Sequence, residues 1–458
     1  MTYFLEPDRA TREAWVRLVS DYLNDYFDAA PGMDAYDGDA DSGVLARLRR
    51  PPAETGRDLA EVLADIEAGS EGGILHPSGG HLSYIPNAGQ FTAALGEFLA
   101  AGLNRYTGIA YCAPGLVAIE HSVVDWMTSL FGLGPDAAGV LLSGGSMANF
   151  TGVVTARSVK LGDDFTRGRI YLTAHTHHSV AKAARLAGFR ADQIVKVAVD
   201  EDRHMDPEAL REAIRADRAA GHDPFLVVAS AGTTDTGAVD DLHAIADVAA
   251  EEGLWLHVDG AYGGFFILTD RGRSRLDGIQ RADSLAVDPH KGMSLPFGSG
   301  AVLVRDESAL VDAHLGRGAY LKAEDEYMGL RDIASLGPEL SRPFRGMSVW
   351  LPLQLHGVAP FRDALDRSLD LAAYAYDRLK GIPGLEKVWR PDLSIVALRF
   401  ADDEVGRKAM ERVNSERKAH LSPTIVEGRF VLRIAVLNRR TTEEHIDHVV
   451  EVIAETLA

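Results

Sequence analysis

The sequence predicts an α/β protein with a mostly parallel central sheet, helices on both faces of that sheet, and a smaller C-terminal α+β domain. Two observations lead to this prediction. Between about residues 138 and 305, short apolar runs alternate with helical patterns, which is the order that βα units produce. After about residue 345, a long helical region, two strand patterns and a final helix follow, which is typical of a separate α+β unit.

The clearest elements lie in the middle of the chain. Residues 225–230 (FLVVAS) form an unbroken apolar run, as expected for a strand that is covered on both faces. A helix is predicted from about Asp241 with Gly253 as its stop, and a second strand follows at residues 254–259. AAGVLLSGGSMANFTGVVTARS and RIYLTAHTHHSVAKAARLAG each predict a strand, a turn and a helix, and SLAVD and GAVLVRD predict further strands.

The two ends of the chain have different patterns. The first 73 residues mix helical patterns, such as RDLAEVLADIEAG, with a polar loop. Near the other end, SIVALRF and FVLRIAVLN predict strands, and TTEEHIDHVVEVIAETL predicts a helix capped near Thr441 or Thr442. We therefore expect three parts: an N-terminal helical segment (1–73), a large domain (74–345) and a small α+β domain (346–458).

Composition excludes several classes of protein. The 458 residues are 46% hydrophobic and 25% charged, as in ordinary globular proteins. A net charge of −20 argues against nucleic acid and an anionic membrane as partners, because both demand a basic face. Cys112 is the single cysteine, so an intrachain disulfide is impossible. We find neither a secretory signal nor an apolar run of about 18 residues, so we expect a cytoplasmic protein.

Five polar loops follow predicted strands. In parallel α/β sheets, ligands bind at the carboxyl ends of the strands, so these loops should gather at one edge. They are residues 143–149, 175–179, 231–235, 259–262 and 288–291.

The loop SGGSMAN opens a predicted helix. Its glycines let the backbone approach a ligand, and free N–H groups at a helix start favour an anion such as phosphate. Ser146 can add a hydroxyl, or the loop can be a plain tight turn capped by that serine. GGSMA is also one residue away from the G-x-S-x-G nucleophile elbow, so a serine hydrolase using Ser146 is an alternative. That alternative leaves the loop around Lys291 unexplained.

Asp259 and a histidine cluster stand in two further loops. An aspartate at the end of a buried strand needs a partner, which can be a protonated ring nitrogen, a helix start or a structural cation. His175, His177 and His178 lie close together, but no acidic or sulfur ligand accompanies them at a familiar spacing, so we predict no metal site. An imidazole ring can instead stack on a flat cofactor.

Lys291 decides between these possibilities. A lysine that is desolvated at a sheet edge is a nucleophile toward carbonyl groups. A phosphate-binding turn, a carboxylate for a ring nitrogen and a Schiff-base lysine together indicate pyridoxal phosphate. A protein that binds this cofactor without catalysis is a third alternative.

From about His76 to the C-terminus, the chain resembles the group II pyridoxal-phosphate-dependent amino-acid decarboxylases, and within them the aromatic-L-amino-acid decarboxylase type. The segments LLSGGSMAN, THHSVAKA, LHVDGAYGG, DPHKG, SRPFRGMSVW and FVLRIAVLNRRTT occur in family order. The resemblance implies a type I pyridoxal-phosphate-dependent transferase fold, similar to that of aspartate aminotransferase. It also implies a homodimer with active sites at the subunit interface and with the N-terminal segment packed on the partner.

The resemblance further implies roles for individual residues. Lys291 would hold the cofactor as an internal aldimine, Asp259 would pair with the pyridinium nitrogen, and His177 would stack on the ring. The other implied cofactor contacts are Gly145, Ser146 and His290 at the phosphate, Thr234 and Ala261 at the ring, and Ser341 at the phosphate from the neighbouring subunit. Asp288 is also an implied cofactor contact, at the phosphate, but it stands where relatives often carry asparagine, and a carboxylate there would repel the phosphate.

Tyr320 matches the tyrosine of the family's mobile catalytic loop, which protonates the α-carbon after carbon dioxide leaves. The implied reaction is decarboxylation of an L-amino acid, most simply an aromatic one, through external aldimine and quinonoid intermediates. Tyr84, Ile85 and Pro86 would line an apolar substrate pocket, with Tyr106 and Gly108 also near the substrate. The alternatives within the family are a decarboxylase of histidine, acidic or diamino acids, and an aldehyde synthase.

Overall fold

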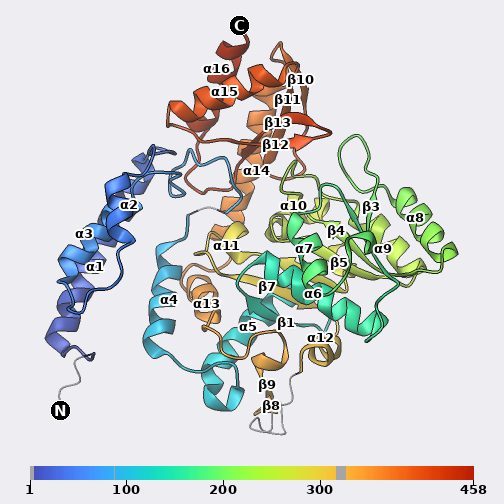
Figure 1. Ribbon diagram of the computed structural model, residues 1–458, viewed down its shortest axis with the longest axis horizontal. Helices are drawn as coiled ribbons and strands as arrows, with labels where there is room; N and C mark the ends of the chain where they lie inside the picture. Colours follow the sequence, from blue (N-terminus) through green and yellow to red (C-terminus); the bar gives the residue numbers. More distant parts are fainter. Residues whose placement is uncertain (1–4, 87, 316–325) are drawn as a thin grey trace.

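The computed structural model describes residues 5–86, 88–315 and 326–458. Its centre is a seven-stranded sheet with the order β1-β7-β6-β5-β4-β2-β3 (Figure 1). Strands β3, β2, β4, β5 and β6 pair in parallel, and β7 runs antiparallel to both β6 and β1. The strands are β1 (Ala138–Leu142), β2 (Gly168–Thr173), β3 (Ile194–Val197), β4 (Asp223–Ser230), β5 (Trp255–Gly260), β6 (Ser284–Val287) and β7 (Gly300–Val304). The predicted mostly parallel sheet is confirmed.

Helices cover both faces of this sheet, as predicted. On β4, Val227 and Ala229 pack into one core with α5, α8 and α9, whereas Leu226 and Val228 pack into another with α6, α7 and α12. This alternation buries the apolar strand on both sides and explains its unbroken sequence pattern. The helices of this part are α4 (Phe91–Leu103), α5 (Pro114–Leu130), α6 (Gly145–Leu161), α7 (His178–Leu186), α8 (Pro207–Ala219), α9 (Leu242–Glu251), α10 (Asp270–Arg275), α11 (Pro289–Gly292) and α12 (Glu307–His314).

The helix predicted from about Asp241 shows how local signals set the boundaries. The Asp241 carboxylate accepts a hydrogen bond from the Ala244 N–H at 3.0 Å and caps α9. Gly253 adopts a φ of +65°, which a residue with a side chain rarely adopts, and the chain turns there into β5.

The C-terminal part contains a second, antiparallel sheet with the order β10-β11-β13-β12. Helices α14, α15 and α16 pack on it around a separate core. α13, which begins at the expected boundary between the large domain (74–345) and the small domain (346–458), packs against α4 and α5 of the large domain. The domain boundary at residue 346 therefore stays a prediction. The elements are α13 (Gly346–His356), α14 (Ala359–Leu379), β10 (Leu385–Val388), β11 (Ile395–Phe400), α15 (Asp403–Ser415), β12 (Ser422–Val426), β13 (Arg429–Ala435) and α16 (Glu443–Leu457), preceded by the hairpin β8 (Glu326–Tyr327) and β9 (Leu330–Arg331).

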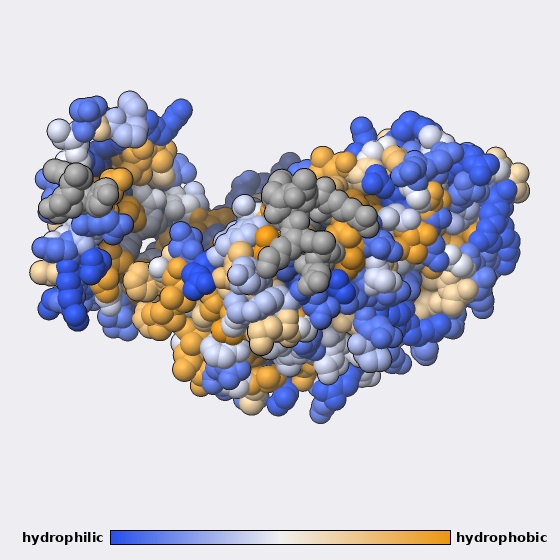
Figure 2. Space-filling model, turned by 90° about the horizontal axis from the view of Figure 1, so that it is seen from below, coloured by the Kyte–Doolittle hydropathy of each residue, from blue (hydrophilic) through white to orange (hydrophobic). Residues whose placement is uncertain are grey.

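The N-terminal helices α1 (Arg9–Ala29), α2 (Ser42–Leu48) and α3 (Leu59–Ser70) form an arm that stands apart from the body (Figure 1). None of the residues in these three helices is buried. Even large apolar side chains stay exposed: Trp15 is 45% exposed and Ile66 is 51% exposed. Figure 2 shows a deep gap between this arm and the body, with hydrophobic residues on both sides. Within the described residues, no helix is both long and apolar enough to cross a membrane.

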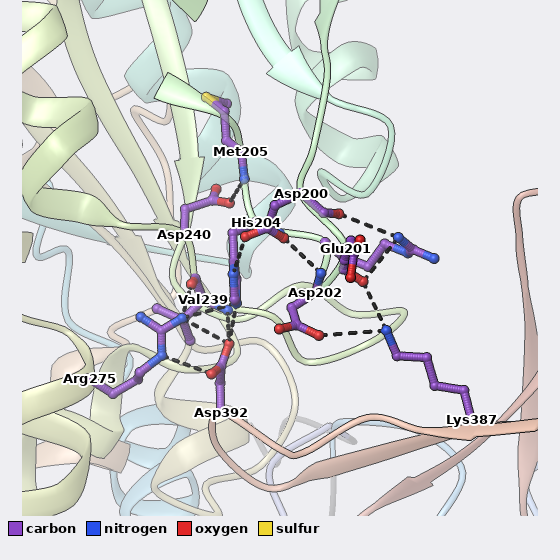
Figure 3. Close-up of polar contacts among 11 residues, drawn as sticks. Asp200, Glu201, Asp202, His204, Met205, Val239, Asp240, Arg275, Lys387 and Asp392 are labelled. Carbon is purple, nitrogen blue, oxygen red and sulfur yellow. Dashed lines mark hydrogen bonds and ion pairs between the residues drawn. The ribbon is translucent and has the colours of Figure 1, made fainter. Parts of the chain in front are cut away.

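A cluster of polar side chains connects loops beside the large sheet to the loop between β10 and β11 of the small sheet (Figure 3). His204 Nδ1 lies 3.0 Å from Asp200 Oδ2, and His204 Nε2 lies 2.9 Å from Asp392 Oδ2, which comes from the loop between β10 and β11. Arg275 of α10 also binds Asp392, with 2.9 Å between Nε and Oδ1. The hydrogen bond to Asp392, together with Asp200, raises the pKa of His204 to about 9 against the opposite effect of burial.

This cluster predicts a pH-dependent stability. Because the pKa of His204 is about 9 when folded and near 6.5 when unfolded, its stabilisation is complete below pH 6.5 and is lost as the pH rises through 9. The shift corresponds to roughly 3 kcal/mol. His204→Gln should therefore lower the free energy of unfolding strongly at pH 6 and little at pH 10, as measured by urea unfolding.

The exposed His243 provides a matched control, and His243→Gln should change stability little at either pH. An equal loss for His204→Gln at both pH values would contradict the prediction.

Candidate active site

A cavity of about 250 Å³ lies where the predicted loops meet at the edge of the large sheet. It is lined by residues that follow β1, β2, β4, β5 and β6, which Figure 1 shows beside α6, α7 and α11. Nine of the predicted site residues line it: Gly145, Ser146, His177, Thr234, Asp259, Ala261, Asp288, His290 and Lys291. The structure thus brings together residues that are up to 146 positions apart along the chain, as the loop pattern predicts.

The lysine follows β6 directly. Pro289 begins the short helix α11, and this turn points Lys291 back at Asp288. Lys291 Nζ lies 2.8 Å from Asp288 Oδ2, and the Asp288 side chain is almost fully buried. Lys291 is therefore not simply desolvated, because it has a buried counter-ion. This finding also gives Asp288 a role, whereas its contact with phosphate stays a prediction.

His290 lies beside this ion pair. Its Nδ1 is 2.5 Å from the Ser299 carbonyl oxygen, so that nitrogen donates a proton and Nε2 is left as the acceptor of the neutral ring. Burial lowers the pKa of His290, partly offset by the nearby Asp288 carboxylate. The ring is thus held neutral and oriented at the cavity.

Asp259 ends β5 with its carboxylate in the cavity wall. Its Oδ1 accepts a hydrogen bond from the Ala261 N–H at 3.1 Å, and its Oδ2 accepts one from Asn149 Nδ2 at 3.0 Å. Within the described residues, no cation pairs with this carboxylate at ion-pair distance, and its hydrogen-bond donors are neutral. That arrangement suits a protonated ring nitrogen.

The three clustered histidines have separate partners. His177 Nδ1 lies 2.7 Å from Ser179 Oγ, and burial lowers the pKa of His177 although the nearby Asp259 carboxylate raises it in part. His175 Nδ1 lies 2.6 Å from Asp235 Oδ2. The His178 ring packs on the His177 ring with 4.2 Å between centroids. His177 is the member that lines the cavity.

The glycine turn before α6 forms a cradle. Gly144 adopts a φ of +149°, and a β-carbon on Gly145 would lie only 2.9 Å from both the Ala261 β-carbon and Asp288 Oδ2. Gly145 and Ser146 are the first two residues of α6, where a helix leaves its N–H groups without intrahelical partners, and both line the cavity. These features suit an anion at a helix start.

The remaining predicted residues lie elsewhere in the single chain. Ser341 is exposed, and Tyr106, whose hydroxyl donates to the Leu340 carbonyl at 3.2 Å, lies beside it with Gly108. Tyr84 is exposed, Ile85 is buried and Pro86 is intermediate, and none of these lines the cavity. Tyr320 lies outside the described residues.

Comparison with known proteins decides the family. A family profile described as "Pyridoxal-dependent decarboxylase conserved domain" matches residues 47–400. This chain belongs to that family. The aromatic-L-amino-acid decarboxylase of Bacillus atrophaeus is 34% identical to it, over 94% of this chain and 91% of that relative. The L-2,4-diaminobutyrate decarboxylase of Rhizobium meliloti is 30% identical, over 98% and 92%.

The fold comparison agrees. The crystal structure of Oryza sativa TDC with PLP and tryptamine matches this decarboxylase with a TM-score of 0.93, covering 99% of both chains at 28% identity. The protein is therefore a pyridoxal-phosphate-dependent amino-acid decarboxylase, and the predicted type I fold is confirmed. The family match therefore rejects the two alternatives of a serine hydrolase and of a cofactor-binding protein without catalysis.

The cavity fits this cofactor. The glycine cradle at the start of α6 suits a phosphate, Asp259 suits a protonated ring nitrogen, and Lys291 lies in the same cavity to bind an aldehyde. Asp288 Oδ1 is buried without a hydrogen-bond partner among the described residues, which leaves an acceptor for a donor on a bound group.

Sequence reasoning missed several residues at this site. Asn149, Ser179, Thr233 and Tyr262 also line the cavity. Asn149 was within reach of sequence analysis, because it lies one helical turn after Gly145 and so shares its face of α6. Arg433 of β13 binds the carbonyl groups of Thr234 and Ser83, and thereby ties the predicted substrate segment to a cofactor loop.

Proposed function

We propose that this enzyme decarboxylates an aromatic L-amino acid to the corresponding amine, and that it works as a homodimer. The observation that carries the proposal is the cavity in which Lys291, Asp259 and His177 meet, in a chain similar over 94% of its length to an aromatic-L-amino-acid decarboxylase. The assigned roles of the individual residues are part of this proposal.

When bound, pyridoxal phosphate supplies an aldehyde and an electron-withdrawing ring. In the proposal, Lys291 Nζ would give up a proton, which Asp288 Oδ2 lies close enough to hold, and would bind the aldehyde carbon with release of water. The Asp259 carboxylate keeps the ring nitrogen protonated, which stabilises negative charge on the substrate's α-carbon. His177 lies against the ring, and Gly145, Ser146 and His290 orient the phosphate.

The charges in the cavity favour an uncharged substrate side chain. Among the described lining residues, the acidic and basic side chains other than histidine are Asp259, Asp288 and Lys291. Each is assigned to the cofactor, so a carboxylate or ammonium on the substrate side chain would lack a partner there. Tyr84 and Ile85, which the resemblance assigns to the substrate although neither lines this cavity, would suit an aromatic side chain.

The deciding experiment is carbon dioxide release from a panel of L-amino acids by the holoenzyme. We expect kcat/KM for tryptophan, tyrosine or phenylalanine to exceed that for histidine, glutamate and 2,4-diaminobutyrate by about tenfold or more, the value of burying a matched side chain. A preference for 2,4-diaminobutyrate or glutamate would overturn the aromatic assignment.

Tyr320 distinguishes a decarboxylase from an aldehyde synthase. If its hydroxyl donates the proton to the α-carbon, Tyr320→Phe should shift the product from amine toward aldehyde and ammonia. Product analysis by chromatography measures this ratio. An unchanged yield of amine would reject the role proposed for Tyr320.

The exposed arm supports a homodimer. Trp15, Val16, Leu45 and Ile66 on the arm, and Phe98 on α4, are large apolar side chains that stay exposed in the single chain, and Figure 2 shows hydrophobic residues on both sides of the gap. A second copy of this chain would cover both apolar surfaces. It would also offer the cluster of Ser341, Tyr106 and Gly108, which lies outside the cavity of its own chain, to the cavity of its partner.

Light scattering should therefore give the mass of a dimer, and Ile66→Asp should shift the protein toward monomer with a parallel loss of activity. Leu186→Asp is the control, because Leu186 is 66% exposed at the end of α7 on the body. A monomeric wild-type enzyme with full activity would contradict the dimer.

A further inference from the structure

A chain of buried hydrogen bonds runs behind Asp259. Trp255 Nε1, which can only donate, lies 2.8 Å from Ser284 Oγ. Ser284 Oγ also lies 2.7 Å from His257 Nδ1, and His257 Nε2 lies 2.9 Å from Asn149 Oδ1. The direction of these bonds is set at Asp259, because its carboxylate only accepts and therefore takes a proton from Asn149 Nδ2. The Asn149 oxygen is then left to accept from His257 Nε2, so His257 Nδ1 accepts the Ser284 proton.

With its oxygen bound to His257, Asn149 turns both amide protons toward the active site. Nδ2 lies 3.0 Å from Asp259 Oδ2 and 3.0 Å from Ser179 Oγ. His177 Nδ1 also accepts the Ser179 backbone N–H at 3.4 Å, so it is an acceptor, and the Ser179 hydroxyl donates to it at 2.7 Å. The His177 proton then sits on Nε2.

Burial makes this arrangement rigid. Asn149 and Ser179 are almost fully buried, and His257 and Ser284 are completely so. Burial also lowers the pKa of His257 to about 4, so its ring stays neutral and donates from one nitrogen only. The polar side-chain atoms of Trp255, Ser284, His257, Asn149 and Ser179 each have a hydrogen-bond partner, and a buried network that is fully satisfied holds a single geometry.

We infer that Asn149 is a positioning residue of the decarboxylase: its amide holds the Asp259 carboxylate toward the cofactor's ring nitrogen and, through Ser179, fixes the tautomer of His177. The inference rests on the roles proposed above for Asp259 and His177. It deepens them, because one side chain controls both the group at the ring nitrogen and the group at the ring face.

Asn149→Asp tests whether the Asn149 amide holds the Asp259 carboxylate. This substitution keeps an oxygen for His257 and removes both N–H groups, and it places a second carboxylate beside Asp259. The two carboxylates must share a proton, so Asp259 no longer presents a full negative charge. We expect the apoenzyme variant to bind pyridoxal phosphate about 10- to 100-fold more weakly than wild type in a spectroscopic titration.

The 1-deaza analogue of the cofactor, which lacks the ring nitrogen, makes this test specific. If Asn149 acts through Asp259 and that nitrogen, wild type and Asn149→Asp should bind the analogue equally. Thr155→Val is the matched control on α6, because Thr155 is buried and its hydroxyl donates to the Thr151 carbonyl at 2.8 Å. It should bind both cofactors as wild type does.

Substitutions at Ser179 test whether Asn149, through Ser179, fixes the tautomer of His177. Ser179→Ala should lower kcat about tenfold while leaving the ratio of the affinities for the two cofactors unchanged, and Ser179→Thr, which keeps the hydroxyl, should restore kcat. Equal weakening of both cofactors by Asn149→Asp would overturn the inference and reduce Asn149 to a structural residue. Release of carbon dioxide from a different class of amino acid would overturn the proposed substrate and leave the inference standing.

Discussion

Lys291→Ala is expected to abolish decarboxylation and to remove the violet absorption band of the bound cofactor. Without Nζ, the described residues that line the cavity include no amine to bind the aldehyde covalently. An absorption spectrum and a carbon dioxide assay measure both effects. Lys182→Ala, at an exposed lysine of α7, is the control and should leave both intact. A violet band in Lys291→Ala would contradict the role of this lysine.

The same substitution should also destabilise the apoprotein. It leaves the buried Asp288 carboxylate without its counter-ion, and breaking a buried ion pair in this way costs about 3–5 kcal/mol. Adding Asp288→Asn to Lys291→Ala removes the orphaned charge and should recover most of the stability in urea unfolding. If the double variant is no more stable than the single one, the pair does not stabilise the apoprotein.

Asp259→Asn should lower kcat by about 10²- to 10³-fold, which is the usual effect of removing one preorganised electrostatic group. A neutral amide cannot keep the ring nitrogen protonated, so charge on the α-carbon is less stabilised. Steady-state kinetics of the holoenzyme measure the loss, and circular dichroism of the apoprotein checks that the fold is kept. Turnover equal to that of wild type would remove Asp259 from the mechanism.

Much of the fold could be predicted because its signals are local. Capping by Asp241, the glycine stop at Gly253 and the apolar run of β4 are each visible within a few residues. The direction of β7 could not be predicted, because GAVLV has the same pattern whether the strand runs parallel or antiparallel.

The site divides in the same way. Residues directly after strands, such as Asp259 and Lys291, could be assigned from their place at the sheet edge. Asn149 could be placed at the site from its position one turn after Gly145, but its role could not be predicted, because its partners His257 and Ser179 are 108 and 30 positions away in sequence. The residues Ser341, Tyr106 and Gly108 came from family resemblance alone, and a single chain does not bring them to the cavity.

The reversed strand β7 has a consequence for how the lysine is held. Because β7 returns antiparallel beside β6, the segment of residues 288–299 leaves and re-enters the sheet at the same edge, with Val287 paired to Ala301. It is a short closed loop rather than a crossover that must travel the length of the sheet. Such contacts have low contact order, so the lysine's surroundings can form early in folding and independently of the distant N-terminal arm. The Lys291–Asp288 ion pair is thus placed by its own hairpin, whereas the rest of the cavity comes from loops that are distant in sequence.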